Sequence, residues 1–369
     1  MIKCAVPFIE GFTKSSGPGH YRNCCATNPQ IISKPEQSFT EWWQSKELND
    51  FRESLVKDSL PKDCSNCELQ EKLQGKSFRT AVNQTVDLKK IDTRWPSRWN
   101  VHFGNVCNLA CWTCNESSSS VILSHKKRLG LLDSNFQDPT IKFQKIWSTL
   151  KNDILNSYNY HKIVHLTILG GEPLYNKEVL NFLTELLQSK LSNRTKLEFH
   201  TNGTQVNKKI TDILKLQNWK YISIFLSIDA VGKKAEWLRY GTNWNNIENN
   251  IPKLVTLSNY FEAHCTLSVL NIKDVVHLNT FCKQKNIKLH IFPIDHPWFM
   301  SLENWDISPT KLTDKKVLAE HGLEEYYNLI GKTPKKGAHQ FLKSYIRSFD
   351  SIRSPLIQFD PVLAKNLEV

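Results

Sequence analysis

The 369-residue sequence lacks several features that would place it outside the ordinary globular proteins. It has no run of about 18 apolar residues, so no transmembrane helix and no membrane contact are expected. Its first residues lack the long apolar stretch of a secretory signal, which favours a cytoplasmic protein. It has no internal repeat, low-complexity tract or sustained heptad. Hydrophobic residues make up 40% of the chain, and this content excludes global disorder.

Acidic residues are the scarcer of the two charged classes. The chain has 48 Lys and Arg against 36 Asp and Glu, a formal net charge of +12. Such a charge suits an anionic partner such as nucleic acid, an acidic peptide or a phosphorylated small molecule, but an ordinary solvated surface gives the same count. The basic helical stretch beyond about residue 305 is interpreted as a solvated surface in preference to a nucleic-acid patch.

Cysteine carries the most information about chemistry. Ten cysteines without an export signal favour metal ligation over disulfides, because the cytosol is reducing. Cys265 and Cys282 lie alone among apolar neighbours and are expected to be inert core thiols. The other eight fall within the first 114 residues: Cys4, Cys24, Cys25, Cys64, Cys67, Cys107, Cys111 and Cys114.

From about residue 98, runs with strand character alternate with helical patterns. This alternation predicts an α/β fold with a parallel sheet, either barrel-like or doubly wound. Residues 1–80 instead show a single amphipathic helix after a capping box of Ser38 and Glu41, so they need a metal staple. The six expected strands are 99–103, 162–169, 196–200, 221–228, 264–270 and 288–294.

Three cysteines just past the first strand have the spacing C-x3-C-x2-C: Cys107, Cys111 and Cys114. Three thiolates on one loop can bind three irons of a 4Fe–4S cube and leave the fourth iron open. A structural zinc site would need a fourth protein ligand. The spacing therefore favours a catalytic cluster, and the alternatives are a zinc site completed from elsewhere or a chance arrangement.

This loop resembles the signature of the radical S-adenosylmethionine (SAM) superfamily. In that family the open iron chelates SAM, and an electron from the cluster releases a 5′-deoxyadenosyl radical that abstracts a substrate hydrogen. The resemblance implies a partial (β/α)6 TIM-like barrel over residues 98–300, a SAM cofactor, and an electron donor such as flavodoxin or ferredoxin. Many relatives have an aromatic residue directly before the third cysteine. Here Thr113 stands there, and Trp112, one position earlier, is the predicted cofactor contact.

Further elements occur at strand ends in the order that the resemblance implies. A Gly-Gly-Glu-Pro run is similar to the family element that meets the methionine amino group. A Ser and an Asp at the end of the fourth strand would suit ribose hydroxyls, and an arginine resembles the one that pairs with the methionine carboxylate. Taken singly, each suits a turn or cap equally well, but barrel active sites collect at strand C-termini. The predicted contacts are Gly170, Gly171, Glu172, Pro173, Asn202, Ser227, Asp229 and Arg239.

A second set of cysteines surrounds the predicted N-terminal helix. Cys64 and Cys67 form a C-x2-C knuckle, and Cys4 and Cys24 lie upstream, with Cys25 as the alternative to Cys24. Four thiolates close a site for a 4Fe–4S cluster or for zinc. The set resembles the twitch module, a shortened SPASM domain that binds an auxiliary 4Fe–4S cluster in radical SAM enzymes. Twitch modules follow the barrel, whereas this one, residues 1–85, would precede it. Residues 305–369 would form a C-terminal helical extension.

The resemblance implies an enzyme that cleaves SAM and abstracts a substrate hydrogen. A peptide or protein side chain is the first choice of substrate, because twitch and SPASM relatives often act on peptides. The alternative within the family is a nucleotide, sugar or nucleic acid, and the alternative from another class is a non-catalytic, zinc-stapled nucleic-acid-binding protein. Residues 292–299 are expected either to line a pocket for a peptide or small-molecule substrate or to form an aromatic core loop.

Overall fold

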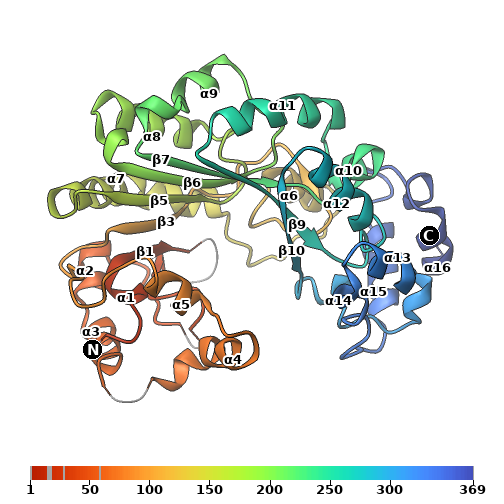
Figure 1. Ribbon diagram of the computed structural model, residues 1–369, viewed down its shortest axis with the longest axis horizontal. Helices are drawn as coiled ribbons and strands as arrows, with labels where there is room; N and C mark the ends of the chain where they lie inside the picture. Colours follow the sequence, from red (N-terminus) through yellow and green to blue (C-terminus); the bar gives the residue numbers. More distant parts are fainter. Residues whose placement is uncertain (1, 15–18, 28–29, 58–59, 369) are drawn as a thin grey trace.

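The computed structural model describes residues 2–14, 19–27, 30–57 and 60–368 (Figure 1). Eight strands form one sheet in the order β10-β9-β7-β6-β5-β3-β1-β2. Seven of these strands pair in parallel and follow one another in chain order, and the last six of them are the six strands expected from the sequence. The sheet stays open among the described residues, so it is a partial (β/α)6 barrel. The six strands are β3 (Arg98–His102), β5 (Val164–Leu169), β6 (Thr195–Thr201), β7 (Tyr221–Ser227), β9 (Tyr260–Leu267) and β10 (Lys288–Pro293).

Helices cover one face of this sheet, and the opposite face, here called the inner face, is left open (Figure 1). Along β5, Val164, Leu166 and Ile168 are buried in the core, whereas the alternating residues on the inner face are partly exposed. The helices of this part are α6 (Ser120–Arg128), α7 (Pro139–Tyr160), α8 (Lys177–Gln188), α9 (Lys208–Ile213), α10 (Gly232–Leu238), α11 (Trp244–Thr256) and α12 (Val275–Gln284).

The N-terminal residues belong to the same sheet. β1 (Glu10–Thr13) pairs in parallel with β3, and β2 (Tyr21–Arg22) pairs antiparallel with β1. The contact is close, since a Cβ on Gly11 would stand 2.7 Å from the Trp99 ring. The boundaries 1–85, 98–300 and 305–369 stay predictions, but a shared sheet joins the first two segments.

The segment predicted as one N-terminal helix forms two helices. The Ser38–Glu41 capping box is present, as predicted, and it opens α2. A new helix then begins at Ser45, whose hydroxyl accepts a hydrogen bond from the Leu48 amide at 3.3 Å. The helices here are α1 (Val6–Ile9), α2 (Phe39–Trp43), α3 (Lys46–Ser54), α4 (Ser65–Gln74) and α5 (Phe78–Asn83).

The C-terminal residues form a helical extension that packs on the strand ends. The Trp237 indole donates to the Ser354 carbonyl at 3.0 Å, and the Tyr240 hydroxyl donates to the Ile352 carbonyl at 2.9 Å. No helix within the described ranges is both long and apolar enough to cross a membrane. The extension contains α13 (Lys315–Glu320), α14 (Glu324–Tyr327), α15 (Ala338–Arg347) and α16 (Pro361–Leu367).

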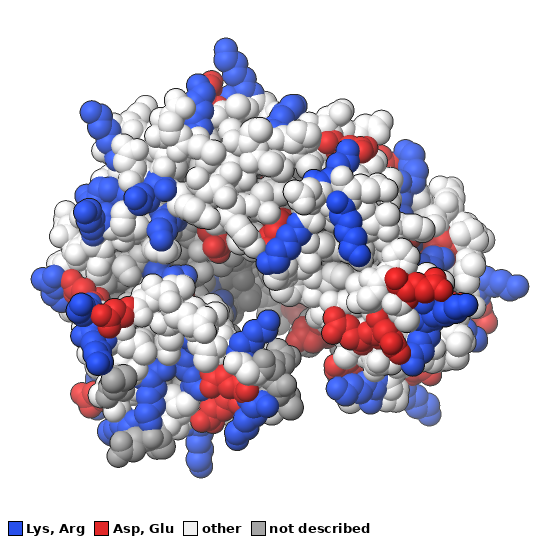
Figure 2. Space-filling model, in the orientation of Figure 1, with Lys and Arg blue, Asp and Glu red and all other residues white. Residues whose placement is uncertain are grey.

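Lys and Arg side chains are scattered over the face seen in Figure 2 and interleaved with acidic side chains. This distribution agrees with the interpretation of the positive charge as an ordinary solvated surface. The same view shows the surface hollowed beside the inner face of the sheet.

Candidate active site

The loop after β3 that carries Cys107, Cys111 and Cys114, here called the cluster loop, is fixed by a short ladder. β4 (Ala110–Cys111) pairs antiparallel with β8 (Arg239–Tyr240), so that Cys111 lies opposite Arg239. The Trp112 amide extends the ladder by donating to the Leu238 carbonyl at 2.9 Å. The predicted arginine is thereby held beside the second cysteine by backbone pairing.

The start of α6 closes the cluster loop from the other side. Its N-cap residue, Ser119, donates its hydroxyl hydrogen to the Leu109 carbonyl at 2.6 Å. The Ser120 hydroxyl donates to the Cys107 carbonyl at 3.0 Å and accepts from the Cys107 amide at 3.2 Å. The loop is therefore held by backbone and hydroxyl bonds that leave the three thiols free to act as ligands.

All three thiols line one cavity, here called the cofactor cavity, which encloses about 850 Å³ of empty space. It lies at the C-terminal ends of β3, β5, β6 and β7, where active sites of barrels are found. Trp112, Pro173 and Asp229 do not line it. Six of the other predicted SAM contacts do: Gly170, Gly171, Glu172, Asn202, Ser227 and Arg239.

The chemistry of the three thiols fits a cluster. Burial raises the pKa of Cys107 and of Cys114 to about 12, and the charge of Cys111 adds to both rises. Burial also raises the pKa of Cys111. Three thiols gathered in this way would keep their protons in the absence of a cation, since thiolates side by side repel one another. A set of three with room beside it suits three irons of a 4Fe–4S cube.

The Gly170–Gly171 turn brings the end of β5 against the cluster loop. Both glycines have positive φ, 87° for Gly170 and 43° for Gly171. A Cβ on Gly170 would stand 2.3 Å from the Gly104 carbonyl oxygen, and one on Gly171 would stand 2.1 Å from that of Val106. Only glycine supplies this backbone at this approach, which explains both residues.

Glu172 joins the ends of β5 and β6. Its Oε1 accepts from the Thr201 hydroxyl at 2.7 Å and from the Leu174 amide at 3.1 Å, and its Oε2 accepts from the Asn202 amide at 2.6 Å. Burial raises the pKa of Glu172, although these hydrogen bonds oppose the rise. The carboxylate therefore organises the cavity wall through its bonds to neighbouring backbone and side chain.

The carboxylate of Asp229 contacts neighbouring protein groups and does not line the cofactor cavity. Its Oδ2 lies 2.8 Å from Arg239 Nε, and its Oδ1 accepts from the Thr266 amide at 2.8 Å. The predicted ribose contact by Asp229 is untested, but both of its oxygens already have protein partners. Ser227 does line the cavity, as a ribose contact would require.

Trp112 faces the C-terminal extension. Its ring centroid lies 5.2 Å from that of Trp237 and 5.7 Å from that of Phe349, and the Arg353 guanidinium carbon lies 4.2 Å from its centroid. Because Trp112 is 2% exposed and does not line the cofactor cavity, the structure gives it a packing contact where the sequence predicted a cofactor contact.

Two histidines that the sequence analysis did not single out, His102 and His200, also line the cofactor cavity. Burial lowers the pKa of each to about 4, so both are neutral near pH 7. His200 lies 5.0 Å from His264 between ring centroids, and Glu262 accepts from His264 Nε2 at 2.7 Å. The signal for this group was the alternation along the strands, which places these side chains on the inner face.

The predicted pocket segment 292–299 divides between two environments. Phe292 lies on the inner face, 5.0 Å from His264 between ring centroids, and it is 48% exposed. Trp298 and Phe299 instead pack against the C-terminal extension, with ring centroids 5.0 Å from Phe341 and 5.3 Å from Tyr345. Only the first part of the segment therefore lies on the inner face.

The second set of cysteines also shares a cavity, here called the N-terminal cavity. Cys4, Cys24, Cys64 and Cys67 line it, and little free space remains between them. Cys25 is exposed and does not line this cavity, which favours Cys24 as the ligand. No three His, Cys, Asp or Glu side chains of the described segments are arranged to ligate a single metal ion.

The thiols of this second set differ in pKa. Burial raises the pKa of Cys4 to about 12 and that of Cys64 to about 11. A hydrogen bond from Cys25 lowers the pKa of Cys24 to about 7, with help from the Ala26 amide. Of Cys4, Cys24 and Cys64, Cys24 therefore gives up its proton most readily.

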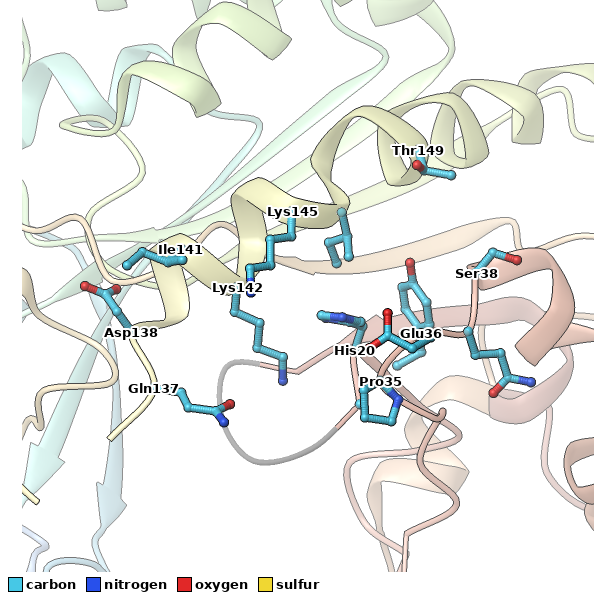
Figure 3. A pocket seen from close by; sticks show the side chains of 14 residues that line it. His20, Pro35, Glu36, Ser38, Gln137, Asp138, Ile141, Lys142, Lys145 and Thr149 are labelled. Atoms are coloured by element: carbon cyan, nitrogen blue, oxygen red, sulfur yellow. The ribbon is translucent and has the colours of Figure 1, made fainter. Parts of the chain in front are cut away.

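A larger groove lies away from both sets of thiols (Figure 3). It encloses about 1500 Å³ of empty space between the segment that follows β2 and the start of α7. Lys142 and Lys145 of α7 point into it toward His20 and Glu36 (Figure 3). Its walls carry charges of both signs and include none of the predicted site residues.

Residues 101–270 match the family model described as the Radical SAM superfamily. This segment is similar to radical SAM domains. It contains the cluster loop, the Gly-Gly-Glu-Pro turn and Arg239, and the protein is an enzyme. No curated protein matches the sequence.

Several solved structures are similar to this chain. Native anSMEcpe with bound AdoMet is 16% identical, with 61% of this chain and 58% of that chain covered and a TM-score of 0.41. Streptococcus suis SuiB bound to S-adenosylmethionine is 17% identical, with 64% and 45% covered and a TM-score of 0.34. SuiB bound to its precursor peptide SuiA is 15% identical, with 81% and 63% covered and a TM-score of 0.39. The chain thus spans less than two thirds of each of these structures.

Proposed function

We propose that the enzyme reductively cleaves SAM and uses the resulting radical to abstract a hydrogen from a peptide or protein side chain. The observation that carries this proposal is the cofactor cavity. It gathers Cys107, Cys111 and Cys114, the Gly170–Gly171 turn and Arg239 at neighbouring strand ends of a radical SAM domain. When bound there, a 4Fe–4S cluster with SAM supplies the electron that cleaves the sulfonium.

The chain's own residues would bind and orient the cofactor. Arg239, held by Asp229, would pair with the methionine carboxylate, because a guanidinium matches a carboxylate in charge and geometry. The glycine turn leaves its backbone open to the ligand, and Ser227 offers a hydroxyl for the ribose. Asp229 would act by holding Arg239 in place.

The inner face favours a peptide side chain over a phosphorylated substrate. Phosphate recognition needs free cations or grouped amide donors. His102 and His200 are neutral near pH 7. Two cations of this face are already engaged: Arg98 pairs with Glu10 at 2.9 Å, and Lys288 pairs with Glu262 at 3.3 Å.

The N-terminal thiols are proposed to hold an auxiliary 4Fe–4S cluster. Cys4, Cys24, Cys64 and Cys67 line one common cavity, and four thiolates can complete the coordination of a 4Fe–4S cluster. A bound cluster would supply a second one-electron centre, and the four thiols would complete its coordination.

The test is anaerobic reconstitution with iron and sulfide, followed by dithionite-driven release of 5′-deoxyadenosine from SAM. The triple variant C107A/C111A/C114A should release none, because the open iron has no anchor without the thiols. The matched control is C282A, which removes a buried thiol that lines neither cavity. Undiminished release by the triple variant would refute the proposed activity.

A further inference from the structure

Arg353, in the C-terminal extension, is a buried cation without a partner. It is 4% exposed, and none of its three guanidinium nitrogens has a hydrogen-bond partner within the described part of the chain. Other buried arginines differ in this respect: Arg239 pairs with Asp229, and Arg79 pairs with Glu71. Arg52 donates to the carbonyls of Pro7 and Trp43.

Aromatic rings around the Arg353 guanidinium compensate its burial only in part. Its central carbon lies 4.2 Å from the centroid of Trp112 and 4.3 Å from that of Phe349. Each such contact stabilises a cation only weakly. Burying an uncompensated ion costs more than these contacts return, so the site calls for a negative charge.

Hydrogen bonds to the residues before and after Arg353 fix its position in the chain fold. The carbonyl of Ile352 accepts from Tyr240, and that of Ser354 accepts from Trp237. Tyr240 belongs to β8, which pairs with the cluster loop. The charge on Arg353 is thereby held at a set place relative to the three thiols.

The negative groups that act on Arg353 include the cluster ligands. Burial lowers the pKa of Arg353, and the charges of Tyr345, Cys111, Tyr240 and Cys114 oppose that lowering. The ring that it covers, Trp112, lies between those two cysteines in the sequence. Of these groups, the two thiolates are the ones that a bound cluster would keep ionised near pH 7.

We propose that Arg353 is a positioning residue that supplies the countercharge for the cluster held by Cys107, Cys111 and Cys114, and that it thereby raises the cluster's reduction potential. This inference rests on the proposed function. Net charge and hydrogen bonds near a cluster set its potential, and a fixed cation favours the state with the extra electron. Nη1 of Arg239 lies 3.8 Å from the Cys111 sulfur, but Asp229 already balances the charge of Arg239.

The test is a potentiometric titration of the reconstituted full-length protein, followed by electron paramagnetic resonance. The catalytic signal is the one that disappears in C107A/C111A/C114A. R353M should make its midpoint more negative by at least 59 mV, which is a tenfold change in the reduction equilibrium for one electron. R353K, which keeps the charge, should lie between R353M and the wild type. R347M is the matched control, because it removes an exposed arginine from α15 of the same extension.

A second measurement covers the case in which R353M loads no cluster. Without iron, R353M should unfold at the same temperature as the wild type or higher, because an uncompensated charge has gone. With iron, the wild type should be the more stable of the two. An unchanged midpoint in loaded R353M, or an R353M protein that fails to fold even without iron, would overturn the inference. A wild type that binds no iron at the three thiols would instead refute the proposed function.

Discussion

Asp229 holds Arg239 by its Nε at 2.8 Å, while Nη1 of the same arginine lies 3.8 Å from the Cys111 sulfur. One carboxylate thus sets the position of a guanidinium that lines the cofactor cavity next to a cluster ligand. The acid acts on the cavity through the arginine, because both of its own oxygens already have protein partners.

Replacing Asp229 by asparagine should weaken SAM binding at least tenfold, equal to about 1.4 kcal/mol, because Arg239 loses the group that orients it. It should also destabilise the protein by about 3 kcal/mol, since one partner of a buried ion pair is removed. SAM affinity is measured by equilibrium binding to reconstituted protein. The control is D274N, which breaks the contact with Lys234 away from the cofactor cavity. Equal SAM affinities for D229N and D274N would contradict this role.

Gly171→Ala should disrupt the cofactor cavity. A Cβ there would stand 2.1 Å from the Val106 carbonyl, so the cluster loop must move. Gly232→Ala is the control, because Gly232 also has positive φ, but a Cβ added to it would meet no other atom within 4 Å. Each change carries a backbone strain of about 1 kcal/mol. Only G171A should also lose iron at the three thiols and SAM cleavage, and equal iron contents and cleavage rates would contradict the packing argument.

The iron content should report two clusters. Reconstituted wild type should carry about eight irons, two cubes of four. C64S/C67S should retain about four, because the N-terminal cavity loses two ligands. C25S should keep the wild-type content, since Cys25 lies outside that cavity. About four irons in the wild type, together with bound zinc, would show that the N-terminal thiols hold zinc.

Acid should destabilise the enzyme through its buried histidines. Burial lowers the pKa of His165 from 6.5 to about 3. Between these values the unfolded chain binds a proton that the folded chain does not, so the free energy of unfolding falls as the pH is lowered from 6.5. H165N removes this contribution. Denaturant titrations at pH 7.5 and pH 5.0 should show a smaller loss in the free energy of unfolding for H165N than for the wild type. Equal losses would show that His165 is not the source of the acid sensitivity.

Local patterns in the sequence predicted the six strands, the capping box and the two sets of thiols, because each depends on residues close together in the chain. Other features depend on contacts between distant residues. α7 was not predicted, although Asp138 caps it and Pro139 begins it. Glu10–Thr13 is too short to identify as a strand until β3 pairs with it.

The candidate site also combines features that local patterns predict with features that depend on distant residues. Spacing alone predicted Cys107, Cys111 and Cys114, and order along the chain predicted the glycine turn and Arg239. The side that Trp112 faces is decided by Phe349 and Arg353, more than 230 positions later in the chain. A lone arginine in a basic stretch gave no signal of its burial.

The pairing of β1 with β3 has a consequence for electron transfer. The cluster loop follows β3, and Cys4 and Cys24 flank the β1–β2 pair, so both thiol sets are attached to one hydrogen-bonded frame. Two redox centres mounted on such a frame would keep a constant tunnelling distance. The rate of exchange between them would then follow their potentials and would not wait for domain motion.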